Sequence, residues 1–107
     1  MATTITGNTI DVNTAVLNRL STDGTIVDLQ KDGTAVGSIQ SRSGVVSTIV
    51  LDPRANGVGL SGTQTAVIPT NNTGVLSNAS MDIGGTGVAF KDLYLSGGVY
   101  LGGTGAA

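Results

Sequence analysis

The residues on which most enzyme active sites depend are missing from this chain of 107 residues. It contains no histidine, no cysteine and no glutamate. A Ser-His-Asp or Cys-His arrangement therefore cannot be built, and the usual general base at neutral pH is absent. A transition-metal site would have carboxylates as its only charged ligands. We expect no enzymatic activity, no cofactor and no metal, and no residue is predicted to be a catalytic or cofactor-binding site.

The aspartates are the remaining candidates for acid–base chemistry. A pair of them can hydrolyse a glycosidic bond when the carboxylates lie roughly 5–9.5 Å apart. Asp23 and Asp32 each precede a glycine, and Asp52 precedes Pro53, so turn formation is the simpler interpretation. The chain also has no Trp, one Phe and two Tyr, which leaves few aromatic platforms for a sugar. The seven aspartates are Asp11, Asp23, Asp28, Asp32, Asp52, Asp82 and Asp92.

Charge is scarce as well. Charged residues make up 11% of the chain, and the net charge is −2. The five basic residues are scattered, so we expect no nucleic-acid partner. No stretch approaches the roughly 20 apolar residues that cross a bilayer, and the first residues do not resemble a signal peptide. We therefore expect no membrane insertion.

Glycine and β-branched residues dominate what is present. There are 17 glycines, more than double the usual share of about 7%. Such a composition fits either a disordered chain or a repetitive β architecture. Disorder goes with low hydrophobicity and high net charge, whereas the mean hydropathy here is +0.26. An ordered β structure that depends on partner chains is the prediction.

A hairpin is the clearest local signal. Residues 25–30 and 34–40 read as strands, and Lys31-Asp32-Gly33 supplies the turn between them. Residues 45–51 (VVSTIVL) form a third strand that is apolar on both faces, which predicts cover on both sides. Residues 52–57 end it with Pro53 and an Asn-Gly pair. Residues 15–20 are the one stretch that could form a short helical turn.

Two patterns in the second half have competing interpretations. Residues 57–62 match the dinucleotide fingerprint G-x-G-x-x-G, but residues 63–69 are β-branched and end in Pro69, so the helix that the mechanism requires is not predicted. Residues 83–89 (IGGTGVA) recur as 101–107 (LGGTGAA), which favours stacked short units over coincidence. The glycosylation patterns at Asn71 and Asn78 are attributed to chance.

Two stretches carry a family resemblance. Residues 23–39 (DGTIVDLQKDGTAVGSI) and 90–103 (FKDLYLSGGVYLGG) resemble tail-fibre and related structural proteins of bacteriophages. The resemblance implies a homotrimer located on the virion, in contact with other tail proteins and supporting attachment to the host. A shaft or connector role is expected rather than a receptor-binding tip.

The predicted fold class is all-β with little or no helix: an elongated, intertwined homotrimer of short strands and Gly-rich turns. A triple β-helix, a β-prism and stacked hairpins stay open as architectures. Residues 1–107 are expected to form one fibre segment, with an extended N-terminal part (1–22) and a repetitive C-terminal part (83–107). The alternative function is a receptor- or carbohydrate-binding module, whose partner would be a host glycan or receptor.

Overall fold

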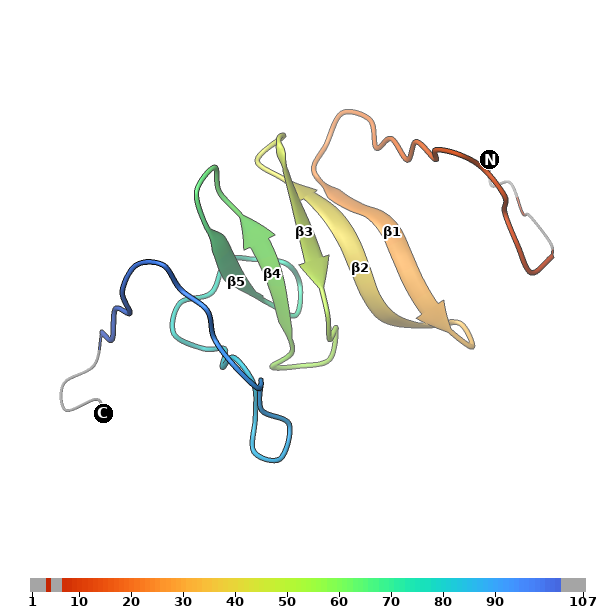
Figure 1. The fold of residues 1–107 in the computed structure, drawn as a ribbon. Helices are drawn as coiled ribbons and strands as arrows, with labels where there is room; N and C mark the ends of the chain where they lie inside the picture. The colour runs from red at the N-terminus through yellow and green to blue at the C-terminus, as the bar shows by residue number, and fades with distance from the viewer. Residues whose placement is uncertain (1–3, 5–6, 103–107) are drawn as a thin grey trace.

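The chain folds around one antiparallel sheet, seen in a computed structural model that describes residue 4 and residues 7–102 (Figure 1). The sheet has five strands in the order of the sequence, so each strand pairs with the next. No helix occurs among the described residues, which confirms the all-β prediction. It follows that no described helix is long and apolar enough to span a bilayer. The strands are β1 (Gly24–Lys31), β2 (Thr34–Arg42), β3 (Val46–Val50), β4 (Val58–Gly62) and β5 (Val67–Asn71).

The predicted hairpin is confirmed in strands β1 and β2. Lys31 pairs with Thr34, and Asp32 and Gly33 between them have φ angles of 52° and 81°. Two consecutive residues with positive φ are what a tight two-residue hairpin turn requires. Register shifts between Thr25 and Val27, and between Leu29 and Gln30, add local twist to this pair.

The predicted third strand and the turn after it are also confirmed. Strand β3 covers most of residues 45–51, and the chain then turns through residues 52–57. Asn56 has a φ of 69°, and the Gly57 amide donates to the Arg54 carbonyl oxygen at 2.8 Å. A Cβ atom on Gly57 would lie 2.0 Å from the Asp52 carbonyl oxygen, so the turn closes too tightly for a side chain there.

The glycine-rich stretch 57–62 is a strand and not a phosphate loop. Strand β4 runs through it, and the next regular element is β5, so the helix of a dinucleotide site does not follow. Pro69 does not end the following strand either, since β5 continues to Asn71. The Pro69 carbonyl oxygen accepts from Ser77 on the outer edge of β5. The missing N–H of Pro69 faces that same outer edge, where it costs the sheet no ladder bond.

The possible helical turn at residues 15–20 is wrong, because this stretch has no regular secondary structure. A single helical turn fixes several residues for one hydrogen bond and needs packing to persist. Here Val16, Leu17 and Leu20 are all exposed, so no packing compensates for that cost.

The core of the chain is very small. Among the described residues Val50 is the one buried hydrophobic side chain, at 3% exposure. The other buried side chains, Thr48, Ser61 and Thr70, are polar. The sheet is therefore held by its ladders and by hydroxyl contacts more than by an apolar interior.

Residues 78–102 lie outside the sheet and contain no strand (Figure 1). The first copy of the predicted repeat forms one tight turn, in which the Gly85 and Val88 backbones exchange hydrogen bonds of 3.3 and 3.1 Å. Most of the second copy, residues 103–107, lies outside the described residues. The chain measures 56 × 32 × 30 Å, so it is elongated as a single copy.

Candidate functional site

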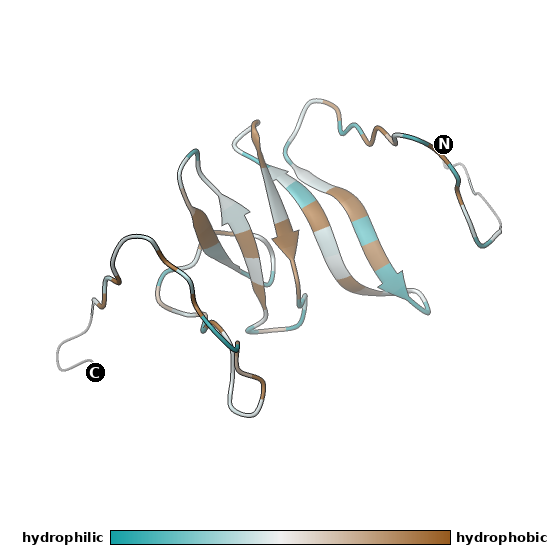
Figure 2. Cartoon of the chain, in the orientation of Figure 1, coloured by the Kyte–Doolittle hydropathy of each residue, from teal (hydrophilic) through white to brown (hydrophobic). Residues whose placement is uncertain are grey.

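One face of the sheet carries a continuous row of apolar residues. Val27 pairs with Ile39, Ile39 with Ile49, Ile49 with Leu60, and Leu60 with Pro69. Paired residues share a face, so these five residues cross all five strands in one line, which we call the apolar row. None of the five is buried, and Ile49 in the central strand is 45% exposed. Figure 2 shows hydrophobic residues in every strand.

The residues flanking the apolar row extend the same surface. They come from the paired positions Leu29 with Gly37, Ser41 with Ser47, Val58 with Asn71, and Gly62 with Val67. None of them is charged. Leu29 and Val67 are exposed. The face that bears the apolar row, called the apolar face below, is therefore mainly hydrophobic, and Leu29, Ile49 and Val67 leave it partly exposed to solvent.

The opposite face, called the hydroxyl face, holds the buried Thr48, Ser61 and Thr70 beside the buried Val50. Val46 and Ile68 on the same face are half-buried. Thr48 Oγ1 donates to Ser61 Oγ at 2.8 Å, and Arg42 Nε donates to the same oxygen at 2.9 Å. Arg42 Nη2 also donates to the Gly62 carbonyl oxygen at 2.6 Å. No described buried side-chain nitrogen or oxygen lacks a partner. Because every buried polar side-chain group here has a hydrogen-bond partner, we interpret the network as structural.

The segment that follows β5 folds back over the end of the hydroxyl face. Asn71 Oδ1 accepts from the Thr73 amide at 2.9 Å, from Thr73 Oγ1 at 2.8 Å and from the Val75 amide at 3.1 Å. These bonds hold a compact turn that brings Gly74 against the Gln40 side chain. Asn72 Nδ2 donates to the Pro53 carbonyl oxygen at 3.2 Å, which ties the turn to the β3–β4 connection. The hydroxyl face is thus covered by the chain itself.

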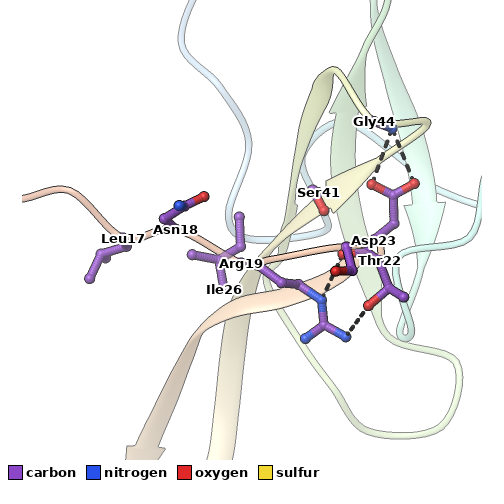
Figure 3. A pocket seen from close by; sticks show the side chains of 9 residues that line it. Leu17, Asn18, Arg19, Thr22, Asp23, Ile26, Ser41 and Gly44 are labelled. Carbon is purple, nitrogen blue, oxygen red and sulfur yellow. Dashed lines mark hydrogen bonds between the residues drawn. The ribbon is translucent and has the colours of Figure 1, made fainter.

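A hollow of about 340 Å³ lies where the N-terminal segment meets the sheet (Figure 3). Arg19 spans it: Nε donates to the Thr22 carbonyl oxygen at 2.9 Å, Nη2 to Thr22 Oγ1 at 3.1 Å and Nη1 to the Thr25 carbonyl oxygen at 3.0 Å. The Asp23 carboxylate accepts from the Gly44 amide at 3.1 Å with both oxygens. All three guanidinium nitrogens bond to the chain, so this pair anchors the first strand and offers no free cation for a ligand.

Three aspartates, Asp28, Asp32 and Asp52, make contacts with residues close by in the sequence. Asp28 accepts from Gln30 Nε2 at 2.8 Å, and Asp32 forms an ion pair with Lys31. Asp52 accepts from Arg54 through Nε at 3.0 Å and Nη2 at 2.7 Å, and from the Arg54 amide at 3.0 Å. The side-chain hydrogen bonds from Arg54, followed by its amide, lower the pKa of Asp52 to about 2. The same pairing raises the pKa of Arg54.

No group of three or more acidic side chains converges on a possible metal site within the part of the chain that the structure describes. Asp23, Asp32 and Asp52 make their contacts in turns or between neighbouring turns, and Asp28 contacts Gln30 within strand β1. The contacts of the first three suit turn formation.

The C-terminal segment presents large side chains to solvent. Phe90, Leu93, Tyr94 and Tyr100 are all more than 70% exposed. Phe90 and Leu93 border an open hollow of about 540 Å³, together with Ile83 and Ala89. The sequence marked this stretch through its resemblance to fibre proteins, whereas the apolar row was missed. The apolar row depends on the register between strands. Hydrophobic alternation within one strand does not show which residues pair across the five strands of the sheet.

No protein-family model, curated protein or solved structure matches this chain.

Proposed function

We propose that this chain is a structural segment of a bacteriophage tail fibre or a similar virion appendage, acting as a shaft or connector in a homotrimer. In this role it carries no catalytic activity and supports attachment of the particle to its host. Its neighbours are other copies of itself and adjoining tail proteins. The resemblance of residues 23–39 and 90–103 to phage fibre proteins supplies the biological setting of the proposal.

The observation that carries the proposal is the amount of surface that one chain leaves in water. The accessible surface is 9232 Å² for a mass of 10.6 kDa. A compact monomer of that mass exposes about 5,500 Å². The radius of gyration is 17.3 Å, against about 13 Å for a compact domain of this length. A chain with a nearly empty core and this much exposed surface suits a subunit that is completed by its neighbours.

An elongated trimer also suits the composition. Three copies can pool their Val, Ile and Leu residues around one axis, giving a shared core that one chain lacks. A β-prism with one sheet on each side, or sheets stacked along a rod, would use the strands as they stand. Closure around an axis would also protect the strand edges, which otherwise template aggregation.

The test of this proposal is the mass and shape of the purified chain in solution. Light scattering coupled to size exclusion, with small-angle X-ray scattering, should give a mass of about three chains in a rod-shaped particle. A compact monomer at every concentration would overturn the proposal.

A second candidate is a carbohydrate- or receptor-binding module, and one observation favours it. Tyr94 is 90% exposed and Tyr100 is fully exposed, and aromatic rings of this kind can stack on sugars. Binding of the chain to a glycan array, lost in a Tyr94→Ala, Tyr100→Ala double variant, would support this candidate. Failure to bind any glycan, with the trimer intact, would leave the structural role as the better account.

A further inference from the structure

We propose that the apolar face of the sheet packs against the same face of other copies of this chain, with Ile49 at the centre of the contact. The inference rests on the proposed function and deepens it, because it names the surface on which the copies meet. It begins from the apolar row of Val27, Ile39, Ile49, Leu60 and Pro69, in which Ile49 is exposed and the other four residues are half-buried.

The central strand gives the first argument. In β3, Thr48 and Val50 point to the hydroxyl face and are buried at 1% and 3% exposure, whereas Ile49 between them is 45% exposed. The sequence of this strand is hydrophobic on both faces, a pattern that belongs to strands covered on both sides. The chain covers the centre of the hydroxyl face through the turn at residues 71–75 and leaves Ile49 exposed on the other side. In our proposal another copy supplies this second cover.

The scarcity of charge favours a second copy as the occupant. Neither the apolar row nor the positions that flank it carry a charge, and the strand residues Asp28 and Arg42 belong to the opposite face. Lys31, at the end of β1, alternates with Val27 and Leu29 on the apolar side, and it is paired with Asp32. Two such faces therefore meet without like-charge repulsion and without burying an unpaired charge. A polyanion or a glycan would find few donors there, since the polar groups are limited to Ser41, Ser47 and Asn71.

Surface area gives the second argument for self-association. One chain exposes about 3,700 Å² more than a compact monomer of its mass, and obligate interfaces bury about 2,000–5,000 Å². This surplus belongs to the whole chain, including the segments outside the sheet, and it is of the size that a permanent assembly removes. Sheets pack face to face about 10 Å apart through interleaved aliphatic side chains, which is what the apolar row provides.

The experiment uses matched lysine variants of the full chain. Ile49→Lys places one positive charge at the centre of the apolar face. Thr25→Lys is the control, because Thr25 is exposed and pairs with Gln40, a residue of the hydroxyl face. We expect the unsubstituted chain and Thr25→Lys to be multimeric by light scattering. Ile49→Lys should have the mass of one chain while it keeps the β-sheet signal in circular dichroism.

Cysteine cross-linking keeps the proposal testable if the lysine variant does not fold. The chain has no native cysteine, so one introduced thiol can react only with another copy. A disulfide cannot span sheets about 10 Å apart, so a short bismaleimide cross-linker is used. With it, Ile49→Cys should form a covalent dimer in the majority of the protein, and Thr25→Cys should stay largely unlinked.

The two proposals fail in different ways. A multimer that persists in Ile49→Lys, with no cross-link from Ile49→Cys, overturns the contact through the apolar face and leaves the fibre role standing. An unsubstituted chain that is monomeric at all concentrations overturns both, and the apolar face would then belong to a foreign protein.

Discussion

The two faces of the sheet differ in how far the chain itself buries them. The centre of the hydroxyl face holds buried threonine and serine side chains beside Val50. The chain covers this centre by itself, with the turn that Asn71 organises. The apolar face holds the larger aliphatic side chains, yet Ile49 at its centre remains 45% exposed. In most single-layer sheets the apolar side faces the core of its own chain. Here the buried centre lies on the face with the smaller side chains, and the face with the larger ones is left for the proposed contact between copies.

The largest effect should come from filling the hydroxyl face. A Cβ atom on Gly59 would lie 2.5 Å from Thr70 Oγ1 and 2.6 Å from the Ile49 carbonyl oxygen. Gly59→Ala should lower the free energy of unfolding by roughly 3 kcal/mol, since backbone and a buried threonine must move apart. The urea midpoint measures this loss.

Gly62→Ala is the matched control in the same strand. The nearest atoms to its Cβ would be the Ala66 carbonyl oxygen and Val46 Cγ1, both at 3.8 Å. Its unfolding free energy should stay within about 0.5 kcal/mol of the unsubstituted chain. Equal losses in the two variants would mean that the close approach at Gly59 does not exist in solution.

The next effect tests how the hydroxyl face is covered. Asn71→Ala removes the oxygen that accepts three hydrogen bonds in the turn at residues 71–75. We expect a loss of about 1–2 kcal/mol in the free energy of unfolding. Hydrogen exchange of the backbone amides should speed up more in β4 and β5 than in β1. Asn78→Ala, at an exposed position, is the control, and its amide exchange rates should match those of the unsubstituted chain.

A third pair of variants separates the faces by their dependence on protein concentration. Thr48→Val removes the buried hydroxyl that donates to Ser61 and should cost about 1 kcal/mol, equally at every concentration. Ile49→Thr should lower the melting temperature chiefly by weakening assembly, so its effect should vary as the chain is diluted. Parallel melting curves for both variants over a hundredfold dilution would contradict this division of roles.

The smallest expected effect lies outside both faces, at Asp52. Its pKa is lowered to about 2 by Arg54, while an unfolded aspartate titrates near pH 3.9. The paired carboxylate therefore stabilises the folded chain above about pH 4, and this contribution is lost as the pH falls toward 2. Urea midpoints between pH 5 and 2 should fall less steeply in Asp52→Asn and in Arg54→Gln. An unchanged slope in both would show that the pair does not form.

Sequence patterns predicted the first half of the sheet well and the second half poorly. Asp32 and Gly33 favour the positive φ angles of a tight turn, so the β1–β2 hairpin can be predicted from the local sequence. Strands β4 and β5 were hidden by Gly59 and Pro69, which are weak strand formers. Gly59 is required by the approach of Thr70, and Pro69 is tolerated by its outward-facing nitrogen. Both reasons lie in neighbouring strands and cannot be read from local sequence.

The candidate surface was less predictable than the fold. That residues 45–51 are hydrophobic on both sides was visible, but the apolar row depends on the alignment of Ile49 with Ile39 and Leu60. A shift of one residue in any pairing would send one of these side chains to the other face. Register is set by turns and bulges acting together, so the surface emerges only when the whole sheet is assembled.

The order of the strands has a consequence for how the protein comes into being. Every strand pairs with the one synthesised just before it, so nearly all contacts in the sheet span a short stretch of chain. Folds with such local contacts form quickly, and single hairpins close within about 1–10 μs. Each copy can therefore complete its sheet while it is still alone. In the proposed assembly, the encounter between copies, which slows as the protein is diluted, is then the slowest step.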